Sequence, residues 1–343
     1  TAHPGTTIRY SSYQSLGNFQ RSTWSATNNF ISRAFIPLNV ISGGTLYGTG
    51  SVAFLTPYVI NPIAPTRMLI GTTAIYESTN QGDSLTRLAY IPGGLHATAL
   101  AYGSRLNGVA KPDVFYVGSV DSNIEHRVNV ADAVSTITYP GSGVFAMAMD
   151  PQNYQKLYVV DNQFPSRRVW ASFNEGVSWV NITANLSTLC GDIRTIEVFS
   201  PDAGIKNTVL IAGGAGGIFQ MRRPGSAGSS WTSLSSGLPH ALFRDLHYDY
   251  TDNVLVAGAL GRGAWTLTNF FRGGGGTGVD VTASTPLPAQ PRNGGRRIRK
   301  MPWQPPVPMR EPGSETNEAP AAPAKEVRPV MLRIHDLMTP CDW

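Results

Sequence analysis

The sequence predicts an all-β fold, and three observations lead to that prediction. Short runs of Val, Ile, Leu, Phe and Tyr are separated by glycine, asparagine and proline, as strands are separated by turns. Apolar residues at the spacing of a helix face are nearly absent between residues 30 and 270. One unit, an apolar strand that ends in a small-residue step, recurs along the same region. We therefore expect many short strands grouped into repeated antiparallel units.

The recurring unit has five recognisable copies. The apolar strands of these copies are Met68–Thr72, Val114–Gly118, Leu157–Asp161, Val209–Gly213 and Val254–Gly258. Successive copies begin 46, 43, 52 and 45 residues apart. An all-β repeat of about 40–50 residues is typical of a β-propeller with four-stranded blades. The sequence therefore predicts a propeller of five to seven blades, five of them recognisable.

The composition divides the chain into a propeller at 1–272 and a Gly/Pro-rich extended tail at 273–343. The tail opens with four consecutive glycines and contains 12 of the 25 prolines. Proline fixes φ and lacks an amide donor, so this region disfavours sheets and long helices. The last repeat lacks a fourth strand, and an unpaired sheet edge is unfavourable. We expect residues 1–50 to close this last blade, with Phe19–Thr27 as the missing strand. The alternative is that residues 1–50 hold another, degenerate unit.

The tail carries two kinds of candidate contact. A basic run at 292–300 would attract an anionic surface, or else form a solvated linker. Its charged residues are Arg292, Arg296, Arg297, Arg299 and Lys300. Large apolar side chains, which a simple linker does not need, are candidate anchors for a protein partner. The anchors are Trp303, Leu332, Ile334 and Leu337. An unstructured tail with incidental apolar residues is the alternative.

The composition also excludes several classes of protein. The charged fraction of 14% is low and the net charge is +5, which argues against disorder of the whole chain. No apolar run approaches the ~18–20 residues of a membrane-spanning helix. The propeller region has no broad basic stripe, so we expect no nucleic-acid partner. Cys190 and Cys341 permit one disulfide but do not require it, and both alternatives stay open.

Two segments, 94 residues apart, share the form Ser-x-Asn-x-Gly-x-x-(large apolar). The first contains Ser78, Asn80, Gly82 and Leu85, and the second contains Ser172, Asn174, Gly176 and Trp179. This form resembles the Asp-box, or bacterial neuraminidase repeat, of one β-propeller superfamily. The resemblance implies a hairpin between the third and fourth strands of a blade. Its Ser and Asn would bond backbone groups, its Gly would take positive φ, and its apolar residue would pack between blades.

Families that share this repeat include sialidases, xyloglucan hydrolases, sortilin-type receptors and photosystem assembly factors, and the fold alone does not choose among them. The Arg-containing start motif of sialidases is absent. Four aspartates near strand starts are more typical of turn caps than of a catalytic pair. They are Asp150, Asp192, Asp245 and Asp249. Histidines at the spacing of metal ligands are also absent. We therefore predict no catalytic residue, no metal and no cofactor.

The sequence favours a non-catalytic interaction protein that works outside the cytoplasm, whether secreted, periplasmic or on the cell surface. The propeller would be a rigid platform, and the tail would dock on neighbouring protein subunits of a larger assembly. The alternative is a glycan-binding protein or glycoside hydrolase that uses the central face of the propeller.

Overall fold

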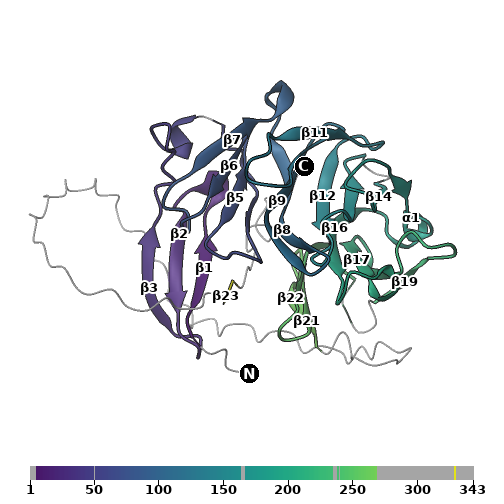
Figure 1. Cartoon of the computed structure of the whole chain (residues 1–343). Helices are drawn as coiled ribbons and strands as arrows, with labels where there is room; N and C mark the ends of the chain where they lie inside the picture. Colours follow the sequence, from purple (N-terminus) through teal and green to yellow (C-terminus); the bar gives the residue numbers. More distant parts are fainter. Residues whose placement is uncertain are drawn as a thin grey trace, which may run out of the picture. The chain divides into compact units, whose positions relative to one another are not determined.

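The computed structural model describes residues 5–49, 51–163, 167–234, 238 and 240–268, together with the backbone of Arg328–Pro329. The strands in these residues form six sheets, which are the blades of a β-propeller (Figure 1). Neighbouring strands are antiparallel except for one short pair beside β1. The predicted all-β propeller is confirmed, and six blades lie within the expected range.

The first three blades come from the N-terminal part of the chain. Blade one contains β1 (Thr7–Ser11), β2 (Gln20–Trp24) and β3 (Phe30–Phe35), with β23 (Arg328–Pro329) beside β1. Blade two contains β4 (Tyr58–Ile60), β5 (Met68–Gly71), β6 (Ala74–Ser78) and β7 (Thr86–Tyr90). Blade three contains β8 (Ala97–Leu106), β9 (Val109–Ser119), β10 (Asn123–Arg127) and β11 (Ser135–Thr138).

The next three blades follow the same up-and-down order. Blade four contains β12 (Val144–Met149), β13 (Leu157–Asp161), β14 (Val169–Ser172) and β15 (Val180–Asn181). Blade five contains β16 (Ile193–Phe199), β17 (Val209–Gly214), β18 (Gly217–Arg222) and β19 (Trp231–Ser233). Blade six contains β20 (Phe243–Asp249), β21 (Val254–Ala259) and β22 (Gly263–Thr268). The helices are one α-helical turn, α1 (Leu186–Leu189), and 3-10 turns at Gln14–Leu16, Leu46–Thr49, Pro92–Gly94 and Ile205–Asn207.

The glycines at the ends of two of the repeated strands have a packing role. A Cβ atom at Gly71, the end of β5, would lie 2.4 Å from the Cβ of Ala97 in β8. A Cβ atom at Gly118 in β9 would lie 2.4 Å from the side chain of Val144 in β12. In both cases the neighbour is the first strand of the next blade. Glycine therefore lets successive blades approach closely near their first strands.

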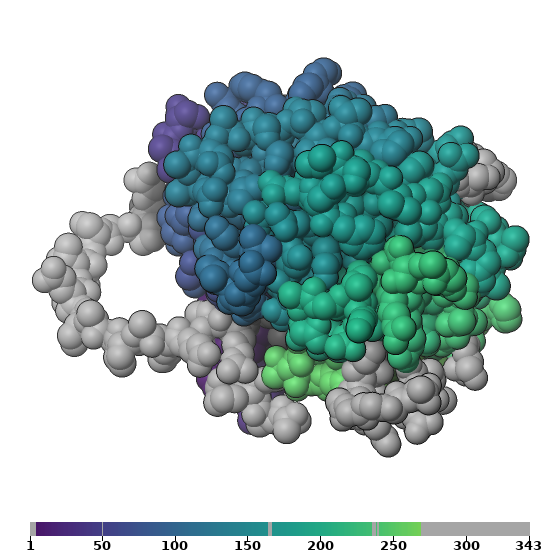
Figure 2. Space-filling view, turned by 45° about the vertical axis from the view of Figure 1, so that its right-hand side comes forward, coloured from purple at the N-terminus to yellow at the C-terminus, as the bar shows by residue number. Residues whose placement is uncertain are grey.

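Five hydrophobic clusters hold successive blades together, one between each neighbouring pair from blade one to blade six. Their largest fully buried side chains include Tyr76, Tyr116, Tyr158 and Trp231. Figure 2 shows the colours advancing from blue through teal to green across one face, so consecutive parts of the chain lie side by side. The hydrophobic core is thus divided into separate layers, each between two neighbouring blades.

One expectation is wrong. The segment predicted to complete the last blade instead forms β2, which pairs with β1 on one side and β3 on the other. Among the described residues, blade six has three strands. Residues 7–35 therefore form the three long strands of a separate blade, joined to blade two through a cluster that contains Phe19 and Ile36.

Candidate functional site

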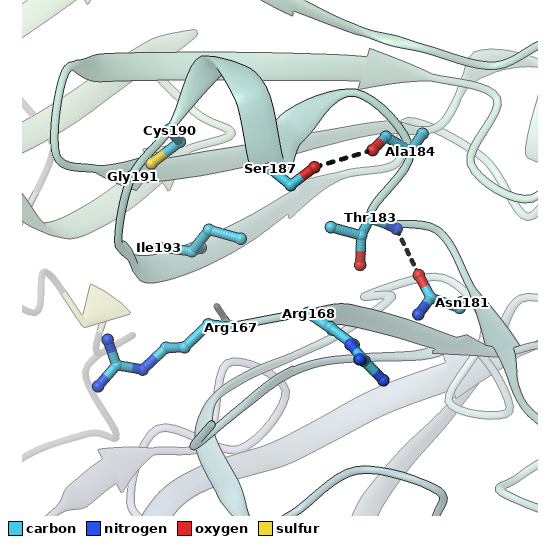
Figure 3. A pocket seen from close by; sticks show the side chains of 9 residues that line it. All are labelled: Arg167, Arg168, Asn181, Thr183, Ala184, Ser187, Cys190, Gly191 and Ile193. Carbon is cyan, nitrogen blue, oxygen red and sulfur yellow. Dashed lines mark hydrogen bonds between the residues drawn. The ribbon is translucent and has the colours of Figure 1, made fainter. Parts of the chain in front are cut away.

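A polar cavity lies at one end of blade four, where β14 begins, β15 ends and α1 leads into β16 (Figure 3). Its volume is about 330 Å³, at the lower end of the ~300–1,000 Å³ of small-molecule sites. It is lined by Arg167, Arg168, Asn181, Thr183, Ala184, Ser187, Cys190, Gly191 and Ile193. The Thr183 amide donates to Asn181 Oδ1 at 2.9 Å, which fixes the turn that leaves β15. The cavity is therefore a preformed hollow with guanidinium, amide and hydroxyl groups around it.

A charged cluster adjoins this cavity. The carboxylate of Asp192 accepts hydrogen bonds from Arg167 and from Arg194. The guanidinium of Arg167 lies 3.9 Å from the centre of the Phe145 ring, a cation–π contact. Burial lowers the pKa of Arg167, and the charge of Asp192 acts in the opposite direction, so the guanidinium stays protonated. The three ionised side chains carry a net charge of +1, which suits a polar or anionic ligand better than a cation.

Three of the four candidate aspartates cap turns or form ion pairs. Asp192 is held between the two arginines. Asp150 is buried, accepts from the Gln152 amide at 2.9 Å and lies 3.4 Å from the Lys156 ammonium. Asp249 accepts from two amides of its own turn, at 2.8 and 3.2 Å. The fourth, Asp245, lies within β20. The contacts of Asp150, Asp192 and Asp249 are thus those of turn caps and ion pairs, and these three carboxylates do not face each other as an acid–base pair.

Cys190 closes one side of the cavity as a free, buried thiol. Burial raises the pKa of this thiol to about 11. At neutral pH it is protonated and a poor nucleophile, because the thiolate is the reactive form. Cys341, the other half of the disulfide left open by the sequence, lies outside the described residues.

The described residues offer few features of other site classes. Among these side chains, no group of three or more His, Cys, Asp and Glu residues is placed to hold a metal ion. His126 stacks on Tyr116 with ring centres 5.7 Å apart, and its Nε2 lies 3.6 Å from Glu175. None of the helices in the described part of the chain has the length and hydropathy of a membrane-spanning helix.

The first Ser-x-Asn-x-Gly segment forms the turn between β6 and β7. Ser78 Oγ accepts from the Gly82 amide at 2.8 Å and donates to Asn80 Oδ1 at 2.9 Å. Asn80 Oδ1 also accepts from the Ser84 amide at 3.0 Å. Gly82 has φ of 93°, and Leu85 is buried in the cluster between blades one and two.

The second segment forms the equivalent turn between β14 and β15, with the same bonds. Ser172 Oγ accepts from the Gly176 amide at 2.8 Å and donates to Asn174 Oδ1 at 3.0 Å. Asn174 Oδ1 accepts from the Ser178 amide at 2.9 Å. Gly176 has φ of 85°, and Trp179 packs against the cluster between blades three and four. Both turns join the third and fourth strands of their blades.

A buried ionic network between blades two and three was not predicted. Glu77 Oε1 accepts hydrogen bonds from Tyr102 Oη at 2.5 Å, Arg67 Nη2 at 2.6 Å and Arg127 Nη2 at 2.9 Å. Arg67 Nη2 also lies 2.8 Å from Asp113 Oδ1. The only signal in the sequence is Glu77 itself, a carboxylate inside a strand of otherwise buried apolar residues. Nothing in the sequence indicates which residues are its partners.

The predicted contacts of the tail lie outside the described residues. This applies to the basic run, to Trp303 and to the three C-terminal anchors. The tail residues that the structure describes are the backbone of Arg328 and Pro329, which pairs in parallel with Thr7 and Ile8 of β1.

Comparisons with known proteins give similarities of fold. No family model matches the chain, and no curated protein sequence matches it. Among solved structures it is similar to YCF48 from Cyanidioschyzon merolae, with 12% identity and a TM-score of 0.41, over 66% of this chain and 69% of that chain. It is also similar to the Cps50 (Swd1) beta-propeller domain of Myceliophteria thermophila, with 10% identity and a TM-score of 0.49, over 66% of this chain and 70% of that chain.

Proposed function

We propose that this chain is a non-catalytic, extracytoplasmic interaction propeller whose tail docks on neighbouring subunits of a larger assembly. The two turns with matching Ser–Asn–Gly hydrogen bonds support assignment to the Asp-box superfamily. Their role is structural, because each buried serine hydroxyl satisfies an amide of its own turn. The basic run at 292–300 adds an anionic surface as a secondary contact.

The observation that carries this proposal is the composition of residues 273–343. Twelve prolines favour an extended conformation in this region, which also contains Trp303, Leu332, Ile334 and Leu337. A proline-rich segment loses less conformational entropy on binding than a flexible one, and its apolar side chains supply the binding free energy. An extended segment with spaced anchors suits the surface of another protein.

The test is the native mass of the protein purified gently from its source, with mass spectrometry of its companions. The proposal expects one stable complex larger than the chain mass of 36.9 kDa, of defined composition. Trp303→Ala combined with Leu332→Ala should release the protein from that complex and leave its thermal unfolding unchanged. Retention of the doubly substituted protein in the complex contradicts tail docking. Protease treatment of intact cells checks the extracytoplasmic location.

The cavity beside blade four favours a second candidate function, the binding of a glycan. Its volume and its amide, hydroxyl and guanidinium groups suit one sugar ring. Arg168→Ala and Asn181→Ala would then each weaken the binding of a sugar detected by ligand-observed NMR. Equal signals from the native protein and both variants would remove this candidate.

A further inference from the structure

The chain has an unusual charge-free surface on blade one and on the segment that joins it to blade two. Residues 10–20 and 34–66 contain no Asp, Glu, Lys, Arg or His. These two stretches lie together. The Ser15 amide donates to the Phe54 carbonyl at 2.9 Å, and the Ile36 amide donates to the Phe19 carbonyl at 2.9 Å. The Tyr47 hydroxyl also donates to the backbone of the first stretch.

Large apolar side chains are exposed on this surface. Tyr13 is 63% exposed, Phe35 67%, Ile41 70% and Phe54 54%, and Tyr47 is 40% exposed. We call these five residues the uncharged surface. A lone folded protein rarely groups exposed aromatic and aliphatic residues without charges among them, whereas the centres of protein interfaces are depleted of charge and rich in aromatics. The uncharged surface therefore has the chemistry of an interface.

An open sheet edge adjoins the uncharged surface. Strand β3 is the outermost strand of blade one in Figure 1, and all six of its residues are exposed. It ends at Phe35, and it also exposes Phe30 and Ile31. The outer backbone groups of such a strand need water or another strand, and a lipid bilayer supplies neither. The edge therefore favours a protein partner over a membrane.

We propose that a second copy of this chain binds here, in a symmetric dimer that buries the uncharged surface and pairs the two β3 edges. A two-fold interface uses the same patch on both copies, so a patch of like charges repels itself while an uncharged one does not. Antiparallel pairing of two identical edge strands also satisfies two-fold symmetry. With the axis at Ser32, each Arg33 faces Ile31 of the other copy, so the two arginines are diagonal neighbours and do not lie directly opposite each other.

The test is sedimentation velocity of the full chain across micromolar concentrations. The expected result is a species of twice the 36.9 kDa chain mass that persists at high salt, because no ion pair holds it together. Phe35→Glu should weaken the dimer by at least about tenfold, since it buries two carboxylates against apolar groups. Val130→Glu is the matched control, because Val130 is 69% exposed on blade three, away from this surface. It should leave the dimer unchanged.

Three results would overturn the proposal. A monomer at every concentration means that the surface is covered by another protein or by residues 330–338 of the same chain. Equal weakening by the two glutamate substitutions makes the effect nonspecific. Loss of the dimer with Leu332→Glu but not with Phe35→Glu assigns self-association to the tail. The last variant separates this inference from tail docking, because the dimer needs no tail contact and the larger assembly does.

Discussion

Replacing Glu77 by glutamine should destabilise the propeller more than the same carboxylate-to-amide change at an exposed ion pair. The carboxylate oxygen receives three charge-assisted hydrogen bonds, from Tyr102, Arg67 and Arg127, and Glu77 is 7% exposed. A neutral amide weakens each bond by about 1 kcal/mol and leaves the buried Arg127 without its counter-ion. The expected loss is therefore about 3 kcal/mol, at the lower end of the ~3–5 kcal/mol for a broken buried ion pair.

Equilibrium unfolding in urea measures this loss, with tryptophan fluorescence as the signal. The control is Asp83→Asn, because Asp83 pairs with Arg21 at 3.0 Å but is 54% exposed. An exposed pair contributes about 0.2–1 kcal/mol, so the control should change the unfolding free energy little. If Glu77→Gln and Asp83→Asn have equal effects, the buried network does not hold blades two and three together, and the reasoning fails.

The Glu77 carboxylate should also make the free energy of unfolding depend on pH in the acid range. Burial alone would raise the pKa of Glu77, but the hydrogen bonds from Tyr102 and Arg67 and the charge of Arg127 outweigh burial and lower it. A carboxyl with a lowered folded-state pKa stabilises the fold above its unfolded pKa of about 4.3, and this contribution is lost as the pH falls through the folded value. The difference in unfolding free energy between the native protein and Glu77→Gln should therefore become smaller as the pH falls. A difference that does not change with pH contradicts the lowered pKa of Glu77.

Three further predictions test the packing and the site. Ser172→Ala leaves a buried turn amide unpaired and should lower the free energy of unfolding in urea by about 1–3 kcal/mol. Ser178→Ala, at an exposed position, should lower it less, and equal losses contradict the role of the turn. Gly71→Ala should cost about 1–3 kcal/mol by overpacking, and Gly48→Ala, which has space around it, should be nearly neutral. Alkylation of Cys190, followed by mass spectrometry, should be slow at neutral pH and rise towards pH 11; fast reaction at pH 7 contradicts its burial.

The sequence revealed the architecture because the strongest repeat signal coincides with the strongest packing constraint. The segments Met68–Gly71 of β5 and Val114–Gly118 of β9 are buried throughout and end at glycines, which admit the next blade. These two demands fix residue type at a similar spacing, 43 to 52 residues, so five of the six blades could be predicted. The turns at Ser78 and Ser172 could be predicted for the same reason, because one hydrogen-bond pattern demands the same residues twice.

Blade one was expected only as the alternative, a degenerate unit in residues 1–50, because its strands do not meet these demands. Strands β1 and β2 are half-buried and contain several polar residues, and β3 is exposed throughout. Without a doubly buried apolar strand there is no period to detect, and the segment was assigned to the wrong sheet. The network at Glu77 was missed for a different reason. Its partners Arg67, Tyr102 and Arg127 lie on different strands, and no local pattern encodes a contact between blades.

Charged residues make up only 14% of the chain, and some of them lie inside the fold. Several of them are buried in ion pairs, among them Glu77 with Arg127 and Asp150 with Lys156. A chain that places scarce charges inside has fewer left for its surface, and a bare apolar surface promotes association. Buried pairs contribute little net stability compared with apolar replacements, but they penalise wrong neighbours strongly. The buried Glu77 network therefore favours the native pairing of blades two and three, and the proposed dimer would use the charge-free residues of blade one.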